Sequence, residues 1–331
     1  MKAHAVVFAE KLKVAYKEVE LPEPKQDEVL IDVDYSWISI GTESSYLRCE
    51  RIGGETPFRE GDPNPYPQVS GYQKVGTITW VGDQVQGLEV GEKVFATMSR
   101  MEGMFYPSGG HVSPALTHCS EVWKLPPNAD SITYSGLVLT QVGYNCGTRP
   151  PVTEGDYAVV IGEGLVGQWT AQTLQRRGAK VIVLGRHDDR LALLPDGVTG
   201  VKRSADIRIQ EALGAAAGKI AIIVDTVGSL AAVTELFDQT QLDCHIVSAG
   251  FLGEEGRIDI QLLRHREATL HSPSGWNRRR MDATLQGIEE GWLQPKPLIT
   301  HILPVEQATV AWELILDRTK PKLGVVLDWR K

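Results

Sequence analysis

The residues with the clearest chemical potential form a glycine pattern at positions 162–167. A short apolar run, Ala158 to Ile161, leads directly into this pattern, and a helix-like segment follows it. The first glycine allows a tight turn, the second leaves the backbone open to a ligand, and the third lets the helix pack against the strand. The helix N-terminus would offer N–H groups and a partial positive charge to phosphates. We interpret the segment as a pyrophosphate-binding turn, with a purely structural strand–helix turn as the alternative. The residues assigned to the cofactor here are Gly162, Gly164, Leu165, Val166 and Gly167.

The next apolar run, Lys180 to Leu184, indicates which dinucleotide is bound. Sites for NAD usually carry an acidic residue at the end of this strand, about 20 residues after the glycines, where it holds the ribose hydroxyls. Here Gly185 stands at that place and Arg186 follows it. We expect the glycine to leave room for a 2′-phosphate and the arginine to pair with it, with Arg190 adding charge. The pattern predicts NADP(H) as the cofactor, and a solvated surface arginine is the alternative for Arg186.

Two further loops follow predicted strands of the same region. Thr226 and Val227 come after the run Ile220–Asp225, and Ala249 and Gly250 come after a fourth strand. In open parallel sheets, ligands bind beyond the carboxyl ends of the strands. We therefore expect both loops to line the nucleotide, with Ala249 and Gly250 nearest the nicotinamide.

From about residue 150, predicted strands alternate with predicted helices, which is typical of a parallel sheet covered on both faces. The strands are expected at Ala158–Ile161, Lys180–Leu184, Ile220–Asp225, Asp243–Val247 and Ala268–Ser272. The helices are expected at Gln168–Arg177, Ile207–Ala215, Ser229–Phe237 and Asp259–Arg264. Residues 1–130 instead show short alternating strands and turn signals, which predict a partly open β-barrel. We place this first domain, which the resemblance described below implies is catalytic, at 1–130, completed by 285–331, and a dinucleotide-binding domain at 131–284.

Composition restricts the possible partners. The chain has 331 residues and a net charge of −8, and it shows no basic stripe, which argues against nucleic acid. It has no apolar run of the ~18 residues that a membrane span requires. Its four cysteines are scattered without C-x-x-C spacing, which fits a reducing cytoplasm and disfavours disulfides. We expect a cytoplasmic protein that acts on a small molecule and binds neither nucleic acid nor membrane.

The whole chain resembles a medium-chain dehydrogenase/reductase. The segments that carry the resemblance are Ser39-Ile40-Gly41-Thr42-Glu43, Gly71-Tyr72-Gln73-Lys74-Val75-Gly76, Val90-Gly91-Glu92-Lys93-Val94, the Gly162–Gly167 turn, Val224-Asp225-Thr226-Val227-Gly228 and Lys322-Leu323-Gly324-Val325-Val326. The resemblance implies an α/β protein with a GroES-like β-barrel catalytic domain, a Rossmann doubly wound parallel sheet, and an active site in the cleft between them. It also implies a homodimer formed through the edge strand near residues 268–272.

Two departures from the zinc alcohol dehydrogenases of this superfamily concern metal. Ile40 stands where those enzymes carry a cysteine ligand, and Tyr72 stands where they carry a histidine ligand. Isoleucine does not bind zinc, and a neutral phenol is a poor ligand. No cysteine occurs at 85–115, where the structural zinc lobe is expected. We predict no catalytic or structural zinc, and the chain is similar to zinc-lacking members such as the bacteriochlorophyllide a dehydrogenase-like group.

Without zinc, protein groups must supply the proton that accompanies hydride transfer. The resemblance places four candidates at the active site: Thr42, Glu43, Tyr72 and His111. Thr42 matches the family position that relays the substrate proton, Glu43 would orient a base, and Tyr72 would point to the vacated metal position. His111 follows two glycines, and histidine is the side chain most often used for general acid catalysis. The alternatives are a turn-stabilising role for Thr42 and Glu43, cavity filling by Tyr72, and a structural histidine.

These features predict a zinc-independent, NADP(H)-dependent oxidoreductase that transfers hydride between nicotinamide and a carbonyl or secondary alcohol. The substrate would be small and possibly cyclic. One alternative is a quinone or enoyl reductase acting on an activated C=C bond, because such reductases also lack zinc. A second alternative is an NADPH-binding protein without catalysis.

Overall fold

The computed structural model describes residues 1–204, 208–253 and 256–330. The chain forms two compact units, which are described separately. The first combines Met1–Val138 with Ile299–Lys331, and the second is the continuous segment Leu139–Leu298. None of the helices in the described residues is long and apolar enough to cross a bilayer.

The second unit is built on a parallel sheet of six strands in the order β14-β13-β12-β15-β16-β17. This is the strand order of the Rossmann sheet, with the reversal between β12 and β15. The strands are β12 Tyr157–Ile161, β13 Lys180–Gly185, β14 Thr199–Lys202, β15 Ile220–Asp225, β16 Thr240–Ser248 and β17 Thr269–His271. Ligands bind at such a reversal, beyond the carboxyl ends of the strands.

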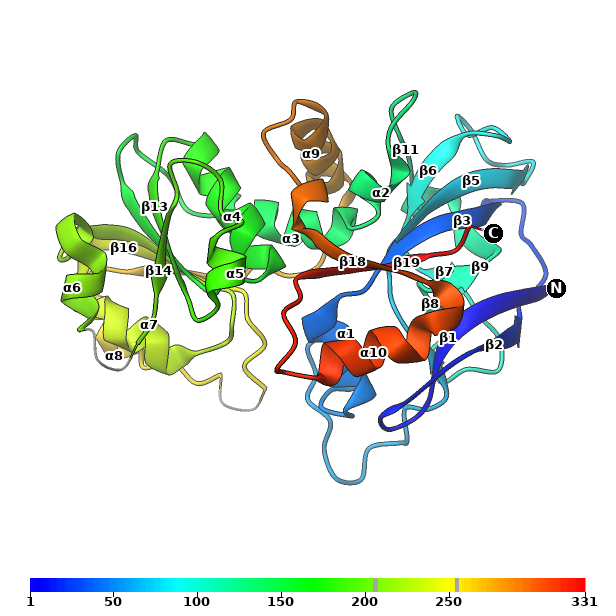
Figure 1. Cartoon of the computed structure of the whole chain (residues 1–331), viewed down its shortest axis with the longest axis horizontal. Helices are drawn as coiled ribbons and strands as arrows, with labels where there is room; N and C mark the ends of the chain where they lie inside the picture. Colours follow the sequence, from blue (N-terminus) through cyan, green and yellow to red (C-terminus); the bar gives the residue numbers. More distant parts are fainter. Residues whose placement is uncertain (205–207, 254–255, 331) are drawn as a thin grey trace. The chain divides into compact units, whose positions relative to one another are not determined.

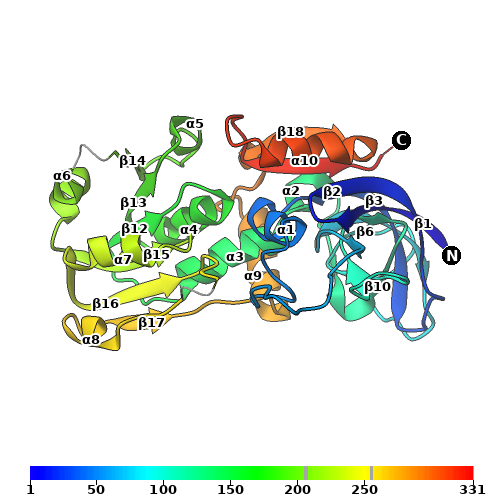
Figure 2. The same ribbon diagram turned by 90° about the horizontal axis from the view of Figure 1, so that it is seen from below.

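Alternating side chains of these strands form two separate cores, one on each face of the sheet. Val159 and Ile161 of β12 pack on one face with residues of α6 and α7, whereas Ala158 and Val160 pack on the other with residues of α3 and α4 (Figures 1 and 2). Because side chains alternate between the faces of a strand, a continuous apolar run is what a sheet covered on both sides requires. The helices of this unit are α3 Leu137–Thr148, α4 Leu165–Arg176, α5 Asp188–Leu191, α6 Ile209–Leu213, α7 Leu230–Phe237, α8 Ile260–Arg264 and α9 Arg278–Glu289.

The first unit is largely antiparallel. Its larger sheet has the order β11-β6-β5-β3-β19-β18, with β10 also paired to β3, and a smaller sheet contains β2, β1, β4 and β9. Together they form the GroES-like barrel. The strands are β1 Lys2–Glu10, β2 Lys13–Glu20, β3 Glu28–Trp37, β4 Gln68–Val69, β5 Lys74–Val81, β6 Lys93–Ala96, β7 Ser99–Arg100, β8 Ser108–Gly109, β9 Val112–Ser113, β10 Ala115–His118, β11 Val122–Lys124, β18 Ile299–Pro304 and β19 Gly324–Asp328.

The C-terminal segment supplies part of this unit's core. Strand β19 pairs antiparallel with β3, and helix α10 (Ala308–Leu316) packs against β1 and against α1 (Ile40–Leu47). Trp312 of α10 is fully buried and meets the Phe8 ring edge-on, with the ring centroids 5.0 Å apart.

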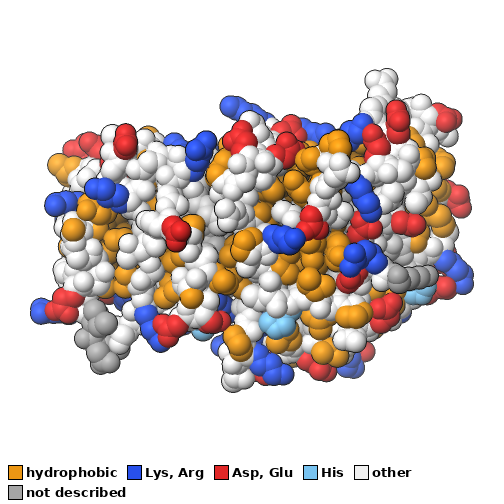
Figure 3. Space-filling view, turned by 45° about the horizontal axis from the view of Figure 1, so that its top comes forward, with side chains coloured by type: hydrophobic (Ala, Val, Ile, Leu, Met, Phe, Trp, Pro, Cys, Tyr) orange, Lys and Arg blue, Asp and Glu red, His pale blue; other side chains and the backbone are white. Residues whose placement is uncertain are grey.

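On the face drawn in Figure 3, acidic and basic side chains are interspersed among apolar ones.

Most predicted elements of the second unit are present, with shifted ends. The helix expected to begin at Gln168 begins at Leu165, directly after Gly164, because the turn itself enters the helix. The helix expected at 207–215 is a short helix at Ile209–Leu213 followed by a 3₁₀ turn at Gly214–Ala216, and its expected first residue lies outside the described residues. Strand β14 and helix α1 were not expected, since neither has a distinctive apolar period.

Candidate functional site

The three glycines of the 162–167 turn have the geometries that their expected roles require. Gly162 has φ of 108°, and a Cβ there would lie 2.6 Å from Thr226 Oγ1. A Cβ on Gly167 would lie 1.9 Å from the Gly162 carbonyl oxygen, so this position must be glycine for α4 to approach β12. A Cβ on Gly164 would have no protein atom within 4 Å. The turn is therefore sterically closed on its protein side and open at Gly164.

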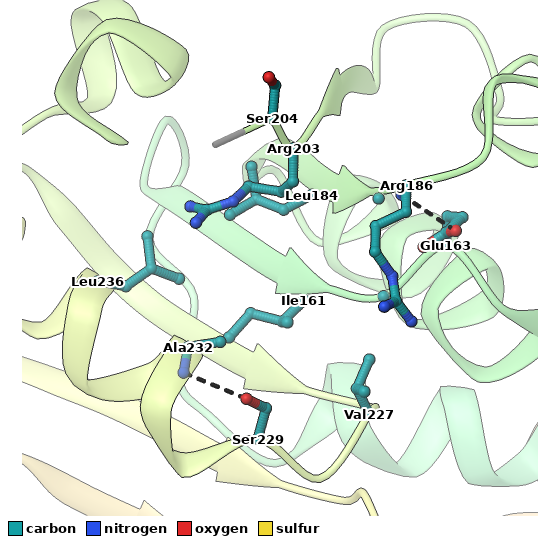
Figure 4. Close-up of a pocket in the computed structure, with 12 residues that line it drawn as sticks. Ile161, Glu163, Leu184, Arg186, Arg203, Ser204, Val227, Ser229, Ala232 and Leu236 are labelled. Carbon is teal, nitrogen blue, oxygen red and sulfur yellow. Dashed lines mark hydrogen bonds between the residues drawn. The ribbon is translucent and has the colours of Figure 1, made fainter. Parts of the chain in front are cut away.

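A pocket of about 380 Å³ lies beyond the ends of β12, β13 and β15 (Figure 4). Its lining combines an apolar floor with charged and hydroxyl groups at the rim. The lining residues are Ile161, Gly162, Glu163, Leu184, Gly185, Arg186, Arg203, Ser204, Val227, Ser229, Ala232 and Leu236. Such a site can hold the adenosine half of a dinucleotide, since the floor would receive the base and the rim the ribose and phosphates.

The two arginines that line this pocket differ in their pairing. Arg203 forms a two-point ion pair with Glu235 of α7, with N–O distances of 2.8 and 3.0 Å. The Arg186 guanidinium is exposed, and within residues 1–204, 208–253 and 256–330 it has no ion-pair partner. Arg190, also expected at the cofactor, lies on α5 and is not part of the pocket lining; its carbonyl accepts a hydrogen bond from Gln168. Arg186 is therefore the cation available to a ligand.

The space beside Gly185 is filled by Glu163, contrary to the expectation that a glycine leaves it open. A Cβ on Gly185 would lie 2.9 Å from Cβ, Cδ and Oε2 of Glu163. Oε1 of Glu163 accepts a hydrogen bond from the Arg186 backbone N–H (3.2 Å) and lies 2.5 Å from Nδ1 of His187. Burial alone would raise the pKa of this carboxyl, but the hydrogen bonds from His187 and from backbone N–H groups hold it below its usual value. An ionised carboxylate thus stands at the end of β13.

The loops after β15 and β16 are both hydrogen-bonded to the buried residue Asp225. Its carboxylate accepts hydrogen bonds from the backbone N–H groups of Val227, Gly228 and Ser229 at 2.8–3.0 Å. The Asp225 carbonyl accepts from the N–H of Ala249 and of Gly250, and a Cβ on Gly250 would lie 1.9 Å from Gly228 N. The two loops, which carry the expected cofactor residues Val227, Ala249 and Gly250, therefore lie side by side. The hydroxyl of Thr226, the fourth expected cofactor residue of these loops, donates a hydrogen bond to the Ile161 carbonyl (2.8 Å).

In the first unit, the structure brings together the four residues expected to supply protons. Nε2 of His111 lies 3.0 Å from Oε2 of Glu43, and both side chains are buried. The other carboxylate oxygen, Oε1, accepts from the Ser39 backbone N–H at the start of α1 (2.7 Å). Glu43 thus caps its own helix with one oxygen and faces the imidazole with the other.

The second nitrogen of His111 is also occupied. Nδ1 lies 2.8 Å from the Ser36 hydroxyl, which accepts a hydrogen bond from the Trp329 indole N–H (2.8 Å). A carboxylate only accepts, so in the neutral ring Nε2 carries the proton toward Glu43, and the Ser36 hydroxyl donates to Nδ1. His111 is 0% exposed. A substrate therefore has no direct access to this imidazole.

Tyr72 and Thr42 form the more accessible part of this cluster, since both side chains are half-buried. Burial raises the pKa of the Tyr72 phenol and the Glu43 charge raises it further, whereas hydrogen bonds with the Ser39 and Thr42 side chains lower it in part. The phenol therefore stays protonated throughout the neutral range. It can donate a hydrogen bond to an oxygen that gains negative charge.

Glycines allow this cluster to pack closely. Gly71 has φ of 79°, and a Cβ there would lie 2.5–2.8 Å from the His111 ring. A Cβ on Gly110 would lie 2.1 Å from the Tyr72 backbone N. These glycines place the segment carrying Tyr72 directly against the segment carrying His111.

The donor set of the first unit does not fit a zinc ion. Ile40, at the position of a cysteine ligand, packs against the apolar cluster around Trp312. His111 and Glu43 bond to each other, and no group of three or more His, Cys, Asp or Glu side chains in the described residues is placed to hold a metal. Zinc sites need three or four such ligands.

No local sequence pattern distinguishes Glu163, Ser36 or Trp329 as site residues. Glu163 stands at the variable position between two glycines, and Ser36 and Trp329 meet only because β19 pairs with β3. The glycine that ends β13 is one sequence feature that could have indicated Glu163. A strand that ends in glycine leaves space for a side chain from another segment, and Arg186 and His187 next to it can bond a carboxylate.

Comparisons with known proteins give relatives along almost the whole chain, although no family model matches. Starvation-sensing protein RspB of Escherichia coli is 24% identical, over 96% of each chain. A 2-desacetyl-2-hydroxyethyl bacteriochlorophyllide A dehydrogenase of Rhodobacter capsulatus is 25% identical over 94% of this chain and 93% of that protein. An acryloyl-coenzyme A reductase of Sulfurisphaera tokodaii is 24% identical over 95% and 96%.

Solved structures match the fold of the entire chain. RspB from E. coli CFT073, complexed with NADH, has a TM-score of 0.83 at 21% identity and 99% coverage of both chains. A proposed zinc-binding dehydrogenase from Sinorhizobium meliloti 1021, bound to NADP, has a TM-score of 0.84 at 17% identity and the same coverage. The two structures thus hold different dinucleotides on one fold.

Proposed function

We propose that this chain, which is similar over about 90% of its length or more to zinc-type alcohol dehydrogenase-like proteins, is a zinc-independent oxidoreductase that uses NADP(H) and acts on a carbonyl or secondary alcohol. The observation that carries the proposal is the glycine turn at the strand-order reversal, open at Gly164 and continuous with a pocket lined by Arg186. The relatives are dehydrogenases and reductases of small molecules, which supports an oxidoreductase of the same class.

The cofactor would be held entirely by residues of the second unit. The N-terminus of α4 and the open backbone at Gly164 suit the pyrophosphate, and the apolar floor of the pocket suits the adenine. Arg186, which lacks an ion-pair partner in the described residues, suits a 2′-phosphate. When bound, the nicotinamide would supply or accept the hydride, and the protein must handle the accompanying proton.

We assign that proton to Tyr72 and Thr42. A carbonyl that accepts hydride becomes an alkoxide, which needs a hydrogen-bond donor and then a proton. The raised pKa of Tyr72 keeps a proton on the phenol, and its hydrogen bond with Thr42 offers a path for reprotonation. Glu43 and the fully buried His111 act as positioning residues, because their bonds to each other and to Ser39 fix the start of α1, where Thr42 lies.

The absence of zinc in this proposal rests on the donor set. Neither Ile40 nor a protonated Tyr72 is a zinc ligand at neutral pH, and His111 and Glu43 already satisfy each other. The phenol would then replace the metal as the group that stabilises charge on the substrate oxygen. Metal analysis of the purified protein tests this point, and one tightly held zinc ion per chain would overturn it.

A second candidate function is reduction of an activated C=C bond. The specific support is the acryloyl-coenzyme A reductases among the relatives, which match 95% or more of this chain. In that chemistry the proton goes to carbon through an enolate, which the same hydroxyl donors would stabilise.

One assay separates these functions. Loss of NADPH absorbance is followed with matched panels of cyclic ketones, enones, acyl-coenzyme A enoyl thioesters and quinones. Turnover of ketones supports the first proposal, whereas turnover restricted to enones, enoyl thioesters or quinones supports the second. If NADPH binds by calorimetry but no panel turns over, a binding protein without catalysis is the remaining candidate.

A further inference from the structure

The pocket of the second unit contains an acid that the sequence pattern does not reveal. In Rossmann sheets that bind the unphosphorylated dinucleotide, the residue ending the second strand is acidic and bonds the adenosine ribose hydroxyls. Gly185 occupies that place here, and its missing side chain is replaced in space by Glu163. The carboxylate reaches the strand end from the glycine turn, two residues before the helix begins.

Three contacts fix this carboxylate. Oε1 accepts from the Arg186 backbone N–H and pairs with His187 Nδ1, and the packing against Gly185 leaves no room for another side chain. The Glu163 side chain is only 8% exposed, yet it lines the pocket together with Gly185 and Arg186 (Figure 4). A group so constrained is preorganised to accept hydrogen bonds from a ligand.

We propose that Glu163 binds the adenosine ribose hydroxyls and that the chain uses NAD(H) as well as NADP(H), with Glu163 and Arg186 setting the balance between them. This inference rests on the proposed function, because it concerns the same dinucleotide site. It goes beyond it by adding a second cofactor and naming the residue that selects it.

The opposing charges give the physical reason for use of both cofactors. A ribose 2′-hydroxyl donates to a carboxylate, so Glu163 favours the unphosphorylated nucleotide. A 2′-phosphate is repelled by that carboxylate but attracted by Arg186, whose guanidinium is exposed at the same rim. Arg203 contributes less, because Glu235 already neutralises it. Each nucleotide therefore meets one favourable charged group, and neither is excluded.

The test measures dissociation constants of NADH and NADPH by titration calorimetry for the full-length protein and the variant Glu163→Gln. The wild type should bind both nucleotides with affinities within about tenfold of each other. Glu163→Gln should weaken NADH and strengthen NADPH, changing the ratio of their dissociation constants at least tenfold. Glu163→Asp keeps the negative charge on a shorter side chain, so its ratio of dissociation constants should lie between those of the wild type and Glu163→Gln. Glu289→Gln, the same change on an exposed residue of α9, is the matched control and should leave the ratio unchanged.

A change of ligand gives a readout that does not depend on the variant folding. NADH lacking the adenosine 2′-hydroxyl should bind wild-type protein at least fivefold more weakly than NADH does. In Glu163→Gln, the two ligands should bind nearly equally. Equal binding of both ligands by the wild type would overturn the assignment of Glu163, as would an unchanged NADH-to-NADPH ratio in a folded Glu163→Gln variant.

The outcomes separate this inference from the proposed function. If the wild type binds NADPH and not NADH, the oxidoreductase proposal stands and the second cofactor is refuted. If it binds neither nucleotide, the proposed function fails first.

Discussion

The imidazole Nε2 of His111 lies 3.0 Å from the carboxylate Oε2 of Glu43, and both groups are buried in the first unit. This pair links the segment after the Gly109-Gly110 turn to the start of α1. Ser36 bonds the second ring nitrogen of His111, and the Ser39 N–H donates to the other carboxylate oxygen of Glu43. The pair therefore has a structural role: it holds in place the segments that carry Tyr72 and Thr42.

Loss of His111 should destabilise the fold. In His111→Leu the Glu43 carboxylate stays buried without its imidazole partner, which should lower the free energy of unfolding by about 3 kcal/mol. Urea unfolding measures the change. The double variant His111→Leu/Glu43→Leu should cost less than the sum of the two single changes, because it removes both partners. Additive costs would show that the pair has no coupling.

Removal of the Tyr72 hydroxyl should affect the chemical step. Tyr72→Phe keeps the ring and deletes the proposed proton donor, so kcat should fall about a hundredfold with little change in nucleotide affinity. Steady-state kinetics with the best substrate of the panel and calorimetry with NADPH measure the two effects. Tyr16→Phe is the matched control, because Tyr16 belongs to the apolar packing beside Trp329. Unchanged kcat in Tyr72→Phe would assign the proton to another group.

Arg186 should discriminate between the phosphorylated and unphosphorylated nucleotides. Arg186→Ala should raise KM for NADPH about tenfold or more, since a charge-assisted pair with phosphate is lost, and should change KM for NADH little. Arg208→Ala removes an exposed arginine of the same unit that pairs with Glu211, and it should affect neither value. Equal effects of Arg186→Ala on both nucleotides would refute its role at a 2′-phosphate.

Two glycines of the turn should respond differently to the same methyl group. Gly164→Ala adds a Cβ where no protein atom lies within 4 Å, so the protein should fold normally but bind NADPH more weakly. Gly167→Ala places a Cβ 1.9 Å from the Gly162 carbonyl oxygen, so the melting temperature should fall as well. Thermal unfolding and calorimetry on both variants test this. Normal nucleotide affinity in Gly164→Ala would argue against a pyrophosphate at this turn.

Lys74 should make stability depend on pH. Burial lowers the pKa of this lysine from 10.5 to about 7, and its ammonium group bonds the Thr97 carbonyl. Between these values the unfolded chain binds a proton that the folded chain does not, so this contribution to stability rises from pH 7 toward pH 10.5. Lys74→Met lacks this dependence. Its melting temperature relative to wild type should be highest near pH 7 and should decline toward pH 10, and a constant difference would contradict the depressed pKa.

The fold could be predicted from the sequence where the local residue pattern directly reflects the burial of an element in the folded chain. The apolar runs of β12 and β15, and the glycine turn between strand and helix, predicted the parallel sheet, and the fold is confirmed. Strand β14 was not predicted because Val201 is the one large apolar residue among its four, and the other three are exposed. Helix α1 was not predicted because it is short and contains glycine and serine, which are poor helix formers.

The site was less accessible, because its decisive contacts join residues distant in sequence. Gly185 was interpreted as space for a phosphate, yet Glu163, 22 positions earlier, fills that space. His111 was expected as a proton donor, and its contacts with Ser36 and Glu43 depend on how the barrel strands pair. A sequence lists such residues but does not indicate which of them meet.

The pairing of β19 with β3 has a consequence for biosynthesis. Residues 299–331 supply two strands and a helix to the first unit, and they leave the ribosome only after all of Leu139–Leu298. Until residues 299–331 are synthesised, the N-terminal barrel lacks β19, and the edge of β3 at residues 35–37 has no partner there. The continuous second unit, by contrast, can fold as soon as it emerges. Translation therefore favours completing the later-encoded unit first, in reverse of the usual N-to-C order.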